Sequence, residues 1–264
     1  MDRYIIIKSK ENPRYRSLCA LHDRKAARAQ GKVFIEGLRL CEDALISGLS
    51  LQTLIIRQDR ISVLEDWKGK YPKIAEAEVL MFSVDIFDKL CKTVNPQGIA
   101  MVVETPVYSS EVFGKQGPCR YIVLEHLQDP GNMGTIIRMA DAFAYDAVLY
   151  TEDSVDPYNE KVLRASMGSC FHIPLVSFAD AETIFQTLVE NRIFSIGAHL
   201  HGRNLSDVSS FPDRKALWVG NEANGLTDTT SSHCDILVKI EMPGKAESLN
   251  AASAASILGY ILAR

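Results

Sequence analysis

Two apolar runs close to the end of the chain each lead into a polar loop that contains glycine. Residues 216–219 precede the loop 220–225, and residues 236–240 precede a Pro-Gly turn and an Ala-rich helix predicted over 249–262. Short apolar runs of this kind are typical of strands buried in a parallel sheet, and polar loops at the carboxyl ends of such strands form ligand crevices. The end of the chain therefore predicts an α/β domain with a binding crevice at one sheet edge.

The rest of the sequence continues this alternation of strand and helix patterns. Further strands are predicted at 33–36, 51–56, 78–82, 99–104, 121–125, 147–150, 173–176 and 193–198. Helices are predicted at 13–30, 37–47, 62–68, 85–91, 160–167 and 181–191, with another ending near 143. The polar, glycine-containing stretch 107–118 is typical of a linker. The pattern predicts a small α/β/α sandwich in residues 1–106 and a second α/β domain in residues 119–264.

Composition argues against several classes of protein. No apolar run approaches the ~20 residues of a membrane span, and the N-terminal residues lack a signal-peptide core. The six cysteines include no CxxC pair, which favours reduced thiols in a cytoplasmic protein over disulfides or a zinc site. We interpret the one close histidine pair, His199 and His201, as loop imidazoles. We therefore expect neither a metal site nor a membrane association.

Positive charge is concentrated at the start of the chain. Residues 1–32 carry nine Lys/Arg against three Asp/Glu, a balance of +6 in a chain whose net charge is −4. The helix predicted over 13–30 carries Arg14, Arg16, Arg24, Lys25 and Arg28. A local positive field of this kind suits a polyanion such as RNA, and a solvated helix face is an equally good interpretation.

A turn at residues 129–134, Asp-Pro-Gly-Asn-Met-Gly, opens the helix that ends near 143. Asn132 is placed to cap the helix, and Arg138 follows six residues later, about 9 Å along the axis. An amide and a guanidinium at a helix N-terminus make a site for an anion or a phosphate-bearing substrate. An ordinary cap and a surface arginine are the alternative. Glu222, in the loop after residues 216–219, places a carboxylate beside the same crevice.

The other catalytic patterns that we searched for are absent. The sequence has no GxGxxG after a strand, no GxxxxGK[ST] phosphate loop, no GxSxG elbow and no HExxH. Ser248 and Asn250 offer a hydroxyl and an amide at the start of the last helix, although capping alone explains Ser248. A nucleotide-handling enzyme of the usual Rossmann type is not supported.

The order and spacing of these motifs resemble the SpoU (TrmH) family of the SPOUT superfamily, which are RNA 2′-O-ribose methyltransferases that use S-adenosylmethionine. The three family motifs look like residues 124–142, 217–226 and 240–252, and 161–168 resembles the segment between the first two. The N-terminal residues are similar to the ribosomal-protein-like substrate-binding domain of several members, through 12–28, 34–37 and 93–100. That combination resembles the branch that acts on large-subunit rRNA.

The resemblance implies a deep trefoil knot in the second domain and a homodimer. It also implies that the loops 199–203, 220–225 and 240–250 hold the cofactor. The expected cofactor contacts are Gly220, Asn221, Ile240, Leu249, Met242 and Leu200. Many relatives have Pro-Met after the position of Ile240, whereas this chain has Glu-Met-Pro, so Met242 is a weaker expectation than Leu249.

The family's reaction gives each motif residue an expected role. A ribose 2′-hydroxyl is a poor nucleophile, so alignment supplies much of the rate, on the order of 7–11 kcal/mol. Because a guanidinium is a reluctant base, we expect Arg138 to grip the neighbouring phosphate and stabilise the developing alkoxide. A phosphate oxygen or Glu222 would take the proton. Asn132, Ser248 and Asn250 would position the ribose and the loops.

Two other functions stay open from the sequence. One is a non-catalytic RNA-binding or ribosome-assembly protein of the same fold, although the chain keeps Arg138, Asn132 and Asn250. The other is a methyltransferase whose target is tRNA rather than rRNA. The N-terminal domain decides between the two RNA classes, and its match to the family is looser than that of the catalytic domain.

Overall fold

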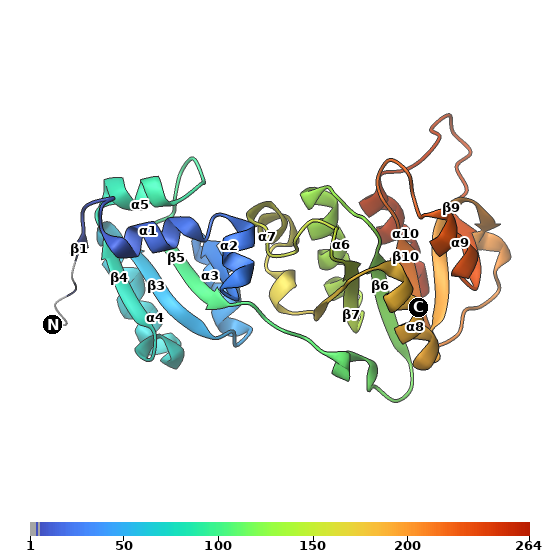
Figure 1. Ribbon diagram of the computed structural model, residues 1–264, viewed down its shortest axis with the longest axis horizontal. Coiled ribbons are helices and arrows are strands. Elements are labelled where there is room, and N and C mark those ends of the chain that lie inside the picture. The colour runs from blue at the N-terminus through green and yellow to red at the C-terminus, as the bar shows by residue number, and fades with distance from the viewer. Residues whose placement is uncertain (1–3, 5) are drawn as a thin grey trace. The chain divides into compact units, whose positions relative to one another are not determined.

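Five short, largely buried strands form the sheet of the first unit (Figure 1). They are β1 (Ile6–Ile7), β2 (Lys32–Glu36), β3 (Leu51–Arg57), β4 (Glu78–Phe82) and β5 (Ile99–Glu104). Their order is β1-β4-β3-β5-β2, and β5 runs antiparallel to both β2 and β3. The computed structural model describes residue 4 and residues 6–264, and it divides into the units Met1–Pro106 and Val107–Arg264.

Helices cover this sheet through two separate sets of contacts. They are α1 (Pro13–Ala20), α2 (Arg24–Ala29), α3 (Leu38–Ile46), α4 (Ile61–Lys70) and α5 (Val84–Leu90). Tyr15 of α1 and Phe87 of α5 belong to one apolar cluster with Phe82 of the sheet. Ala44 of α3 and Trp67 of α4 are buried outside that cluster, and their helices contact β2, β3 and β5. The predicted α/β architecture is confirmed.

One predicted helix is divided in two. The sequence favoured a single helix over 13–30, but α1 ends at Ala20 and α2 begins at Arg24. The Asp23 carboxylate accepts a hydrogen bond from the Ala26 amide (2.8 Å) and so caps a new helix. The prediction of one helix was wrong because apolar spacing continues across a residue that begins a helix of its own.

The second unit has a six-stranded sheet in which every pairing is parallel (Figure 1). Its strands are β6 (Cys119–Leu124), β7 (Ala147–Thr151), β8 (Leu175–Phe178), β9 (Phe194–Asn204), β10 (Arg214–Val219) and β11 (Ile236–Lys239). Their order is β11-β9-β10-β6-β7-β8. Fully buried side chains such as Tyr121 and Trp218 explain the unbroken apolar runs of these strands.

The connections of this sheet leave its centre in opposite directions. The helices are α6 (Pro130–Ala142), α7 (Glu160–Ser166), α8 (Ala181–Glu190), α9 (Asp228–His233) and α10 (Ala251–Leu262). From β6 the chain continues through α6 to β7 on one side, and from β10 it continues through α9 to β11 on the other. Since β6 and β10 are neighbours, their carboxyl ends flank a topological switch point, the place where open α/β sheets bind ligands.

Strand β9 is longer than the sequence predicted. It continues through residues 199–203, which we expected to form a loop, because its pairing with β11 shifts register between Leu237 and Val238. Residues 198–202 pass the partner strand without pairing, and Arg203 and Asn204 resume the ladder. A Cβ on Gly202 would lie 2.6 Å from the Leu237 carbonyl carbon, so this close approach needs glycine.

Residues 107–118, predicted as a linker, pack onto the second unit. The short helix Ser110–Phe113 places Phe113 in that unit's apolar cluster, and its ring centroid lies 5.3 Å from that of Tyr121. The Tyr121 hydroxyl donates to the Val112 carbonyl (2.9 Å). Most of the segment is therefore anchored to the second unit along its length.

Helix α9 is a second feature absent from the predicted elements. Its residues have weak helix propensity, and the helix depends on a cap from Thr227.

The contact between α6 and α7 gives a test of the packing. A Cβ on Gly134 would lie 2.5 Å from the Ala165 Cβ and 2.8 Å from the Val162 carbonyl oxygen. We expect Gly134→Ala to lower the free energy of unfolding by about 2 kcal/mol, because backbone must move to make room. Gly244→Ala is the control, since nothing lies within 4 Å of its added methyl. Equal stability of both variants in urea denaturation would contradict this close contact.

Candidate active site

The loop after β10 is joined to the start of α6 by one carboxylate. Glu222 accepts hydrogen bonds from the backbone amides of Asp129 (2.8 Å) and Gln128 (3.2 Å) and from the side-chain amide of Asn132 (3.1 Å). Asp129 in turn caps α6 through the Asn132 backbone amide (2.8 Å). The carboxyl ends of β6 and β10 are thereby fixed together at the switch point of the sheet.

Asn132 connects this carboxylate to the third motif. Its side chain is buried, and while its Nδ2 donates to Glu222, its Oδ1 accepts from Asn250 Nδ2 (2.8 Å). The Asn250 oxygen caps α10 through the amides of Ala252 (2.9 Å) and Ser253 (3.2 Å). One amide thus bridges segments that are 90 and 118 residues away in the sequence. The structure brings together Asn132, Glu222 and Asn250, as the order of the motifs predicted.

Beside this network lies a cavity of about 330 Å³. It is lined by all six expected cofactor contacts, namely Gly220, Asn221, Ile240, Leu249, Met242 and Leu200. Glu222 and Ser248 line it too, whereas Asn132, Asn250 and Arg138 do not. The loops after β10 and β11 and the unpaired part of β9 meet here. The volume is within the range of small-molecule sites, which start near ~300 Å³.

The loop after β10 is held in one shape. Asn221 and Gly225 exchange backbone hydrogen bonds of 3.0 and 2.8 Å, and the Asn221 side chain donates to the His126 carbonyl (2.9 Å). A Cβ on Gly220 would overlap the carbonyl of Gly225, so only glycine fits there. The Asn221 oxygen also accepts from the Ala223 amide (2.9 Å). This rigid loop offers backbone polar groups to the cavity, and Ile240 and Leu249 offer apolar surface. Such a cavity suits a ligand with one polar and one apolar part.

Glu222 is held ionised by its hydrogen bonds. Partial burial by itself raises the pKa of this carboxyl, but donors from Asp129 and Asn132 more than offset that effect and hold the pKa below its usual range. Both oxygens already accept hydrogen bonds. A carboxylate with a lowered pKa and occupied lone pairs is a weak proton acceptor. The site therefore favours Glu222 as a clamp that holds two loops together. A phosphate oxygen, the alternative proton acceptor, becomes the better hypothesis.

Arg138 lies outside the cavity. It is exposed on α6, and within the described residues it makes no hydrogen bond or ion pair. Six residues at ~100° each turn it about 120° away from Asn132 around the helix axis. The structure therefore leaves the guanidinium available to an external group, and it does not bring Arg138 and Asn132 into one pocket within this chain.

The expected RNA-contacting side chains are partly engaged within the protein. Arg14 pairs with Glu78 (2.6 Å), and Arg16 pairs with Glu11. The others in the set are Arg24, Lys25 and Arg28, all on α2. Arg24 and Arg28 also have interactions within the chain. Arg3, which contributes to the basic charge of residues 1–32, lies outside the described residues.

A second buried carboxylate lies at this edge and was not predicted from the sequence. Glu125, 1% exposed, accepts from the Thr227 amide (3.0 Å) and from the hydroxyls of Thr227 (2.9 Å) and Thr230 (2.5 Å). It ties the end of β6 to the residues that follow the Gly220–Gly225 turn. A charged residue at the end of an apolar strand was the one available signal, since buried carboxylates are found with partners.

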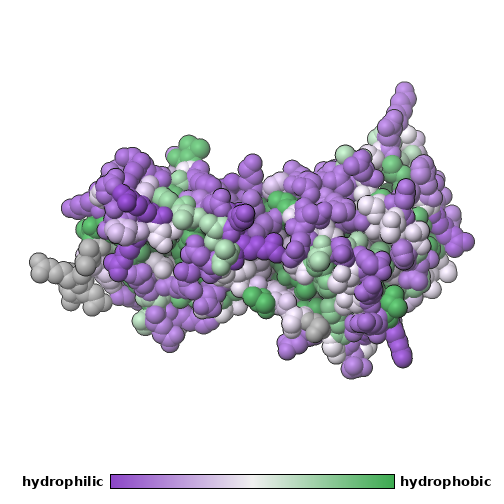
Figure 2. Space-filling view, in the orientation of Figure 1, coloured by the Kyte–Doolittle hydropathy of each residue, from purple (hydrophilic) through white to green (hydrophobic). Residues whose placement is uncertain are grey.

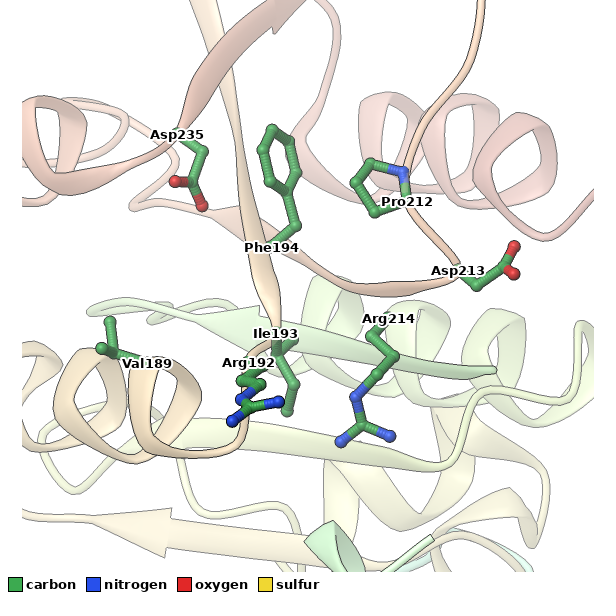
Figure 3. A pocket seen from close by; sticks show the side chains of 8 residues that line it. All are labelled: Val189, Arg192, Ile193, Phe194, Pro212, Asp213, Arg214 and Asp235. Atoms are coloured by element: carbon green, nitrogen blue, oxygen red, sulfur yellow. The ribbon is translucent and has the colours of Figure 1, made fainter. Parts of the chain in front are cut away.

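A larger cavity of about 580 Å³ lies at the amino-terminal ends of β9, β10 and β11 (Figure 3). Figure 3 shows Arg192 and Arg214 on one side of it and Asp235 on another. Arg214 already donates to the carbonyls of Lys115 (2.9 Å) and Asn191 (3.0 Å), and Asp235 accepts from the Ser195 amide (2.7 Å). These side chains support the local backbone, and the cavity contains none of the motif residues.

Two further searches give negative results within the part of the chain that the structure describes. No group of three or more His, Cys, Asp or Glu side chains is arranged to hold a metal ion. No helix among these residues is long and apolar enough to cross a membrane.

A parallel sheet with a cavity at its switch point, bordered by rigid loops and a carboxylate–amide network, defines an α/β domain that binds a small organic ligand. Comparison with known proteins makes this class specific. Residues 120–260 match the model of the SpoU rRNA Methylase family, and residues 12–101 match the MRM3-like substrate binding domain. The chain belongs to the SpoU rRNA methylase family, as its motifs predicted.

Relatives cover both units of the chain. The 23S rRNA (guanosine(2553)-2′-O)-methyltransferase RlmP of Bacillus subtilis is 33% identical over 263 residues, which are 97% of this chain and 98% of that protein. The AdoMet complex of the SpoU methyltransferase AviRb from Streptomyces viridochromogenes matches with a TM-score of 0.86 and 27% identity, over 96% and 97% of the two chains. The AdoMet-bound rRNA methyltransferase of Sinorhizobium meliloti gives 0.85 and 26%, over 99% and 97%.

The clamp role of Glu222 predicts a pH-dependent contribution to stability. We expect Glu222→Gln to lower the free energy of unfolding by about 1 kcal/mol at pH 7, a value reduced because solvent screens this exposed group. Since the folded-state pKa is lowered, the contribution is complete above the unfolded pKa of about 4.3 and is lost as pH falls below it. Urea denaturation at pH 7 and near pH 3 measures both limits.

Glu241→Gln is the matched control for this pair of measurements. Glu241 is exposed in a neighbouring loop and makes no hydrogen bond or ion pair among the described residues. Its variant should match the wild type at both pH values. A stability difference for Glu222→Gln that persists undiminished at low pH would show that the ionised carboxylate is not the source.

Proposed function

We propose that this protein transfers a methyl group from S-adenosylmethionine to a ribose 2′-hydroxyl of large-subunit rRNA. The observation that carries the proposal is the Asn132 bridge to Glu222 and Asn250, which assembles the three motifs around the cavity. The chain also aligns over 97% and 94% of its length with two relatives named for this activity on 23S rRNA. Because one relative carries both units at similar length, the N-terminal unit enters the proposal together with the catalytic one.

The cavity supports S-adenosylmethionine as the methyl donor. When bound, this cofactor supplies an electrophilic methyl group on a sulfonium. Gly220, which only glycine can fill because its Cβ would overlap the Gly225 carbonyl, lets the loop close into the turn that lines the cavity, while Ile240 and Leu249 offer apolar contact. Met242 and Leu200, which also line the cavity, contact the cofactor in the same proposal. The rigid Gly220–Gly225 turn keeps these contacts in place before binding, so little ordering is needed when the ligand arrives.

Arg138 is proposed to act on the RNA and not on the cofactor. Its exposed guanidinium, without a partner in the described chain, suits bidentate contact with a phosphate beside the reacting ribose. In that position it stabilises the alkoxide that forms as the 2′-hydroxyl loses its proton. A substrate phosphate oxygen takes that proton, since Glu222 is occupied as a clamp. Ser248, at the cavity wall, orients the ribose, and Asn250 holds the last loop.

We also propose a homodimer formed through α10. This helix exposes three large apolar side chains, Ile257, Tyr260 and Ile261, each 41–43% accessible. Apolar side chains gathered on one helix face favour burial against a second copy. The Tyr260 ring lies 5.3 Å from that of Phe143, which follows α6, the helix that carries Arg138. A second copy bound to this face would place its cavity near Arg138 of the first copy, which lies outside the cavity of the first copy.

The setting proposed for this activity is the cytoplasm. All six cysteines are free in the structure, and a reducing compartment keeps such thiols free.

Methyl transfer to separated RNA pools tests the function directly. Purified protein is incubated with tritiated S-adenosylmethionine and with 23S rRNA, 16S rRNA or tRNA from a strain that lacks the gene. We expect label in 23S rRNA, at a single ribose that resists alkaline cleavage. Label confined to tRNA would overturn the rRNA target, and calorimetry without any S-adenosylmethionine binding would favour a non-catalytic assembly protein.

The role of Arg138 predicts a loss of turnover without a loss of cofactor binding. Arg138→Ala and Arg138→Lys should each lower kcat by at least ~100-fold, because a lysine is a point charge that lacks the bidentate geometry. The calorimetric affinity for S-adenosylmethionine should stay unchanged, since Arg138 does not line the cavity. Arg192→Lys, at the opposite sheet edge, is the control. Near-normal turnover of Arg138→Lys would remove the bidentate role.

The proposed dimer predicts that one charge on α10 separates the subunits. Ile261→Glu should halve the mass measured by light scattering, because it would bury a carboxylate in an apolar interface. Methyl transfer should fall with it, as each site would lose the partner's arginine. Val189→Glu on α8 is the matched control, since Val189 is 72% exposed on a different helix. An unchanged mass for Ile261→Glu would place the interface elsewhere or exclude it.

A further inference from the structure

The loop between α5 and β5, residues 92–98, is fastened to the first unit near both of its ends. At its start, the Glu36 carboxylate accepts from the backbone amides of Lys92 (3.0 Å) and Thr93 (3.3 Å) and from the Thr93 hydroxyl. Near its end, Arg57 donates to the Pro96 carbonyl (3.3 Å). Arg57 is itself held by Asp88 (2.8 Å), so the loop is tied to charged groups that are fixed by others.

The last two residues of the 92–98 loop complete this attachment. The Gln97 side-chain oxygen accepts from the Leu38 amide (2.7 Å) and caps α3, whose own preceding residue is a glycine without a capping side chain. Gly98 adopts φ +85, and a Cβ there would lie 2.6 Å from the Arg60 Cγ. Glycine is thus required for this close packing. The loop therefore has little freedom to change its shape.

This rigid loop presents an apolar side chain to water. Val94, at its tip, is 94% exposed, the most exposed large hydrophobic side chain among the described residues. Figure 2 shows hydrophobic colour at the tip of the loop that follows α5 in Figure 1. Asn95, beside it, is also exposed and makes no hydrogen bond within the described chain. The loop is thus fixed by polar contacts, while its tip leaves an apolar group and an amide exposed to solvent.

Positive charge flanks the tip on two sides. On one side, Lys92 donates to the His22 carbonyl (3.5 Å), in the turn that leads into Arg24 and Lys25 of α2. On the other side, Gln97 joins the loop to the start of α3, where Arg39 is exposed and makes no ion pair among the described residues. An apolar tip between cations fits a polyanion that offers an unstacked base, which is how proteins recognise single-stranded RNA loops.

We propose that the Val94–Asn95 tip receives an unstacked base of the rRNA substrate, while Lys92 and Arg39 contact the phosphates on either side of it. The Val94 methyl groups cover the face of the base, and the free amide of Asn95 hydrogen-bonds to its edge. This inference rests on the proposed function for the identity of the RNA. It makes the 92–98 loop a determinant of which RNA is bound, separate from the cavity and from Arg138.

Binding to protein-free 23S rRNA tests the inference with the full chain. Filter binding gives the Kd for the wild type, for Val94→Ser and Val94→Glu, and for the control variants Val107→Ser and Val107→Glu. Val107 is 90% exposed in the segment after the first unit, so each control changes an equally exposed valine in the same way. Calorimetry with S-adenosylmethionine and the unfolding curve show that the fold and the cavity are intact.

We expect Val94→Ser to weaken RNA binding roughly fivefold, the equivalent of one modest apolar contact, and Val94→Glu at least about tenfold. KM for the RNA should rise with Kd while kcat at saturating RNA stays the same. Both Val107 variants should bind like the wild type. Equal Kd values for the Val94 and Val107 variants would overturn the proposal.

The same experiment keeps this inference distinct from the proposed function. If the wild type binds 23S rRNA and Val94→Glu weakens that binding, but no methyl group is transferred to 23S rRNA, the proposed function is wrong. The tip would then remain an RNA contact. Normal binding of Val94→Glu to free rRNA with lowered methylation of ribosomal particles would show a protein partner at the tip and overturn the inference. No binding of the wild type to 23S rRNA would overturn both.

Discussion

The site depends on the orientation of one buried amide. Asn132 donates to Glu222 and accepts from Asn250, so its nitrogen and its oxygen each face the one partner that matches them. Because the side chain is buried, a reversed or missing amide would remove one hydrogen bond from each partner, and an unpaired buried polar group costs about 1–3 kcal/mol. The relative position of three loops therefore rests on a contact between residues that are distant in the sequence. Cofactor loops that are fixed in this way need little rearrangement to bind.

This arrangement separates holding from reacting. The polar atoms of Glu222, Asn132 and Asn250 form hydrogen bonds with one another and with backbone amides. Few of these atoms are therefore available for the reaction. Arg138 is the opposite case, since it is exposed and without a partner in the described residues. A guanidinium that must receive an RNA phosphate has to be free beforehand, and a loop clamp has to be occupied. The occupied or free state of each side chain thus indicates its role better than its position in a motif.

Sequence patterns predicted the features that a motif marks. The parallel domain, the SpoU membership and the convergence of residues near Asn132, Gly220 and Asn250 followed from motifs and their spacing. Contacts between distant residues that belong to no motif were missed. Glu125 meets Thr227 across 102 residues, and the extension of β9 depends on a register shift against β11. Periodicity reports neither kind of contact, and the trefoil knot that the family implies stays a prediction.

The same type of contact, a carboxylate that accepts hydrogen bonds from backbone amides, occurs in both units. Glu36 accepts the amides of Lys92 and Thr93, Glu222 accepts those of Gln128 and Asp129, and Glu125 accepts that of Thr227. In each case a carboxylate at the end of a strand or in the loop just after it holds the backbone of a loop from another part of the chain. For Glu222, whose pKa is lowered by its donors, these hydrogen bonds are charge-assisted and about twice as strong as neutral ones, so few are needed to hold a loop. The 92–98 loop of the first unit and the loops beside the cavity of the second are therefore fixed by the same kind of contact, a carboxylate that accepts backbone amides.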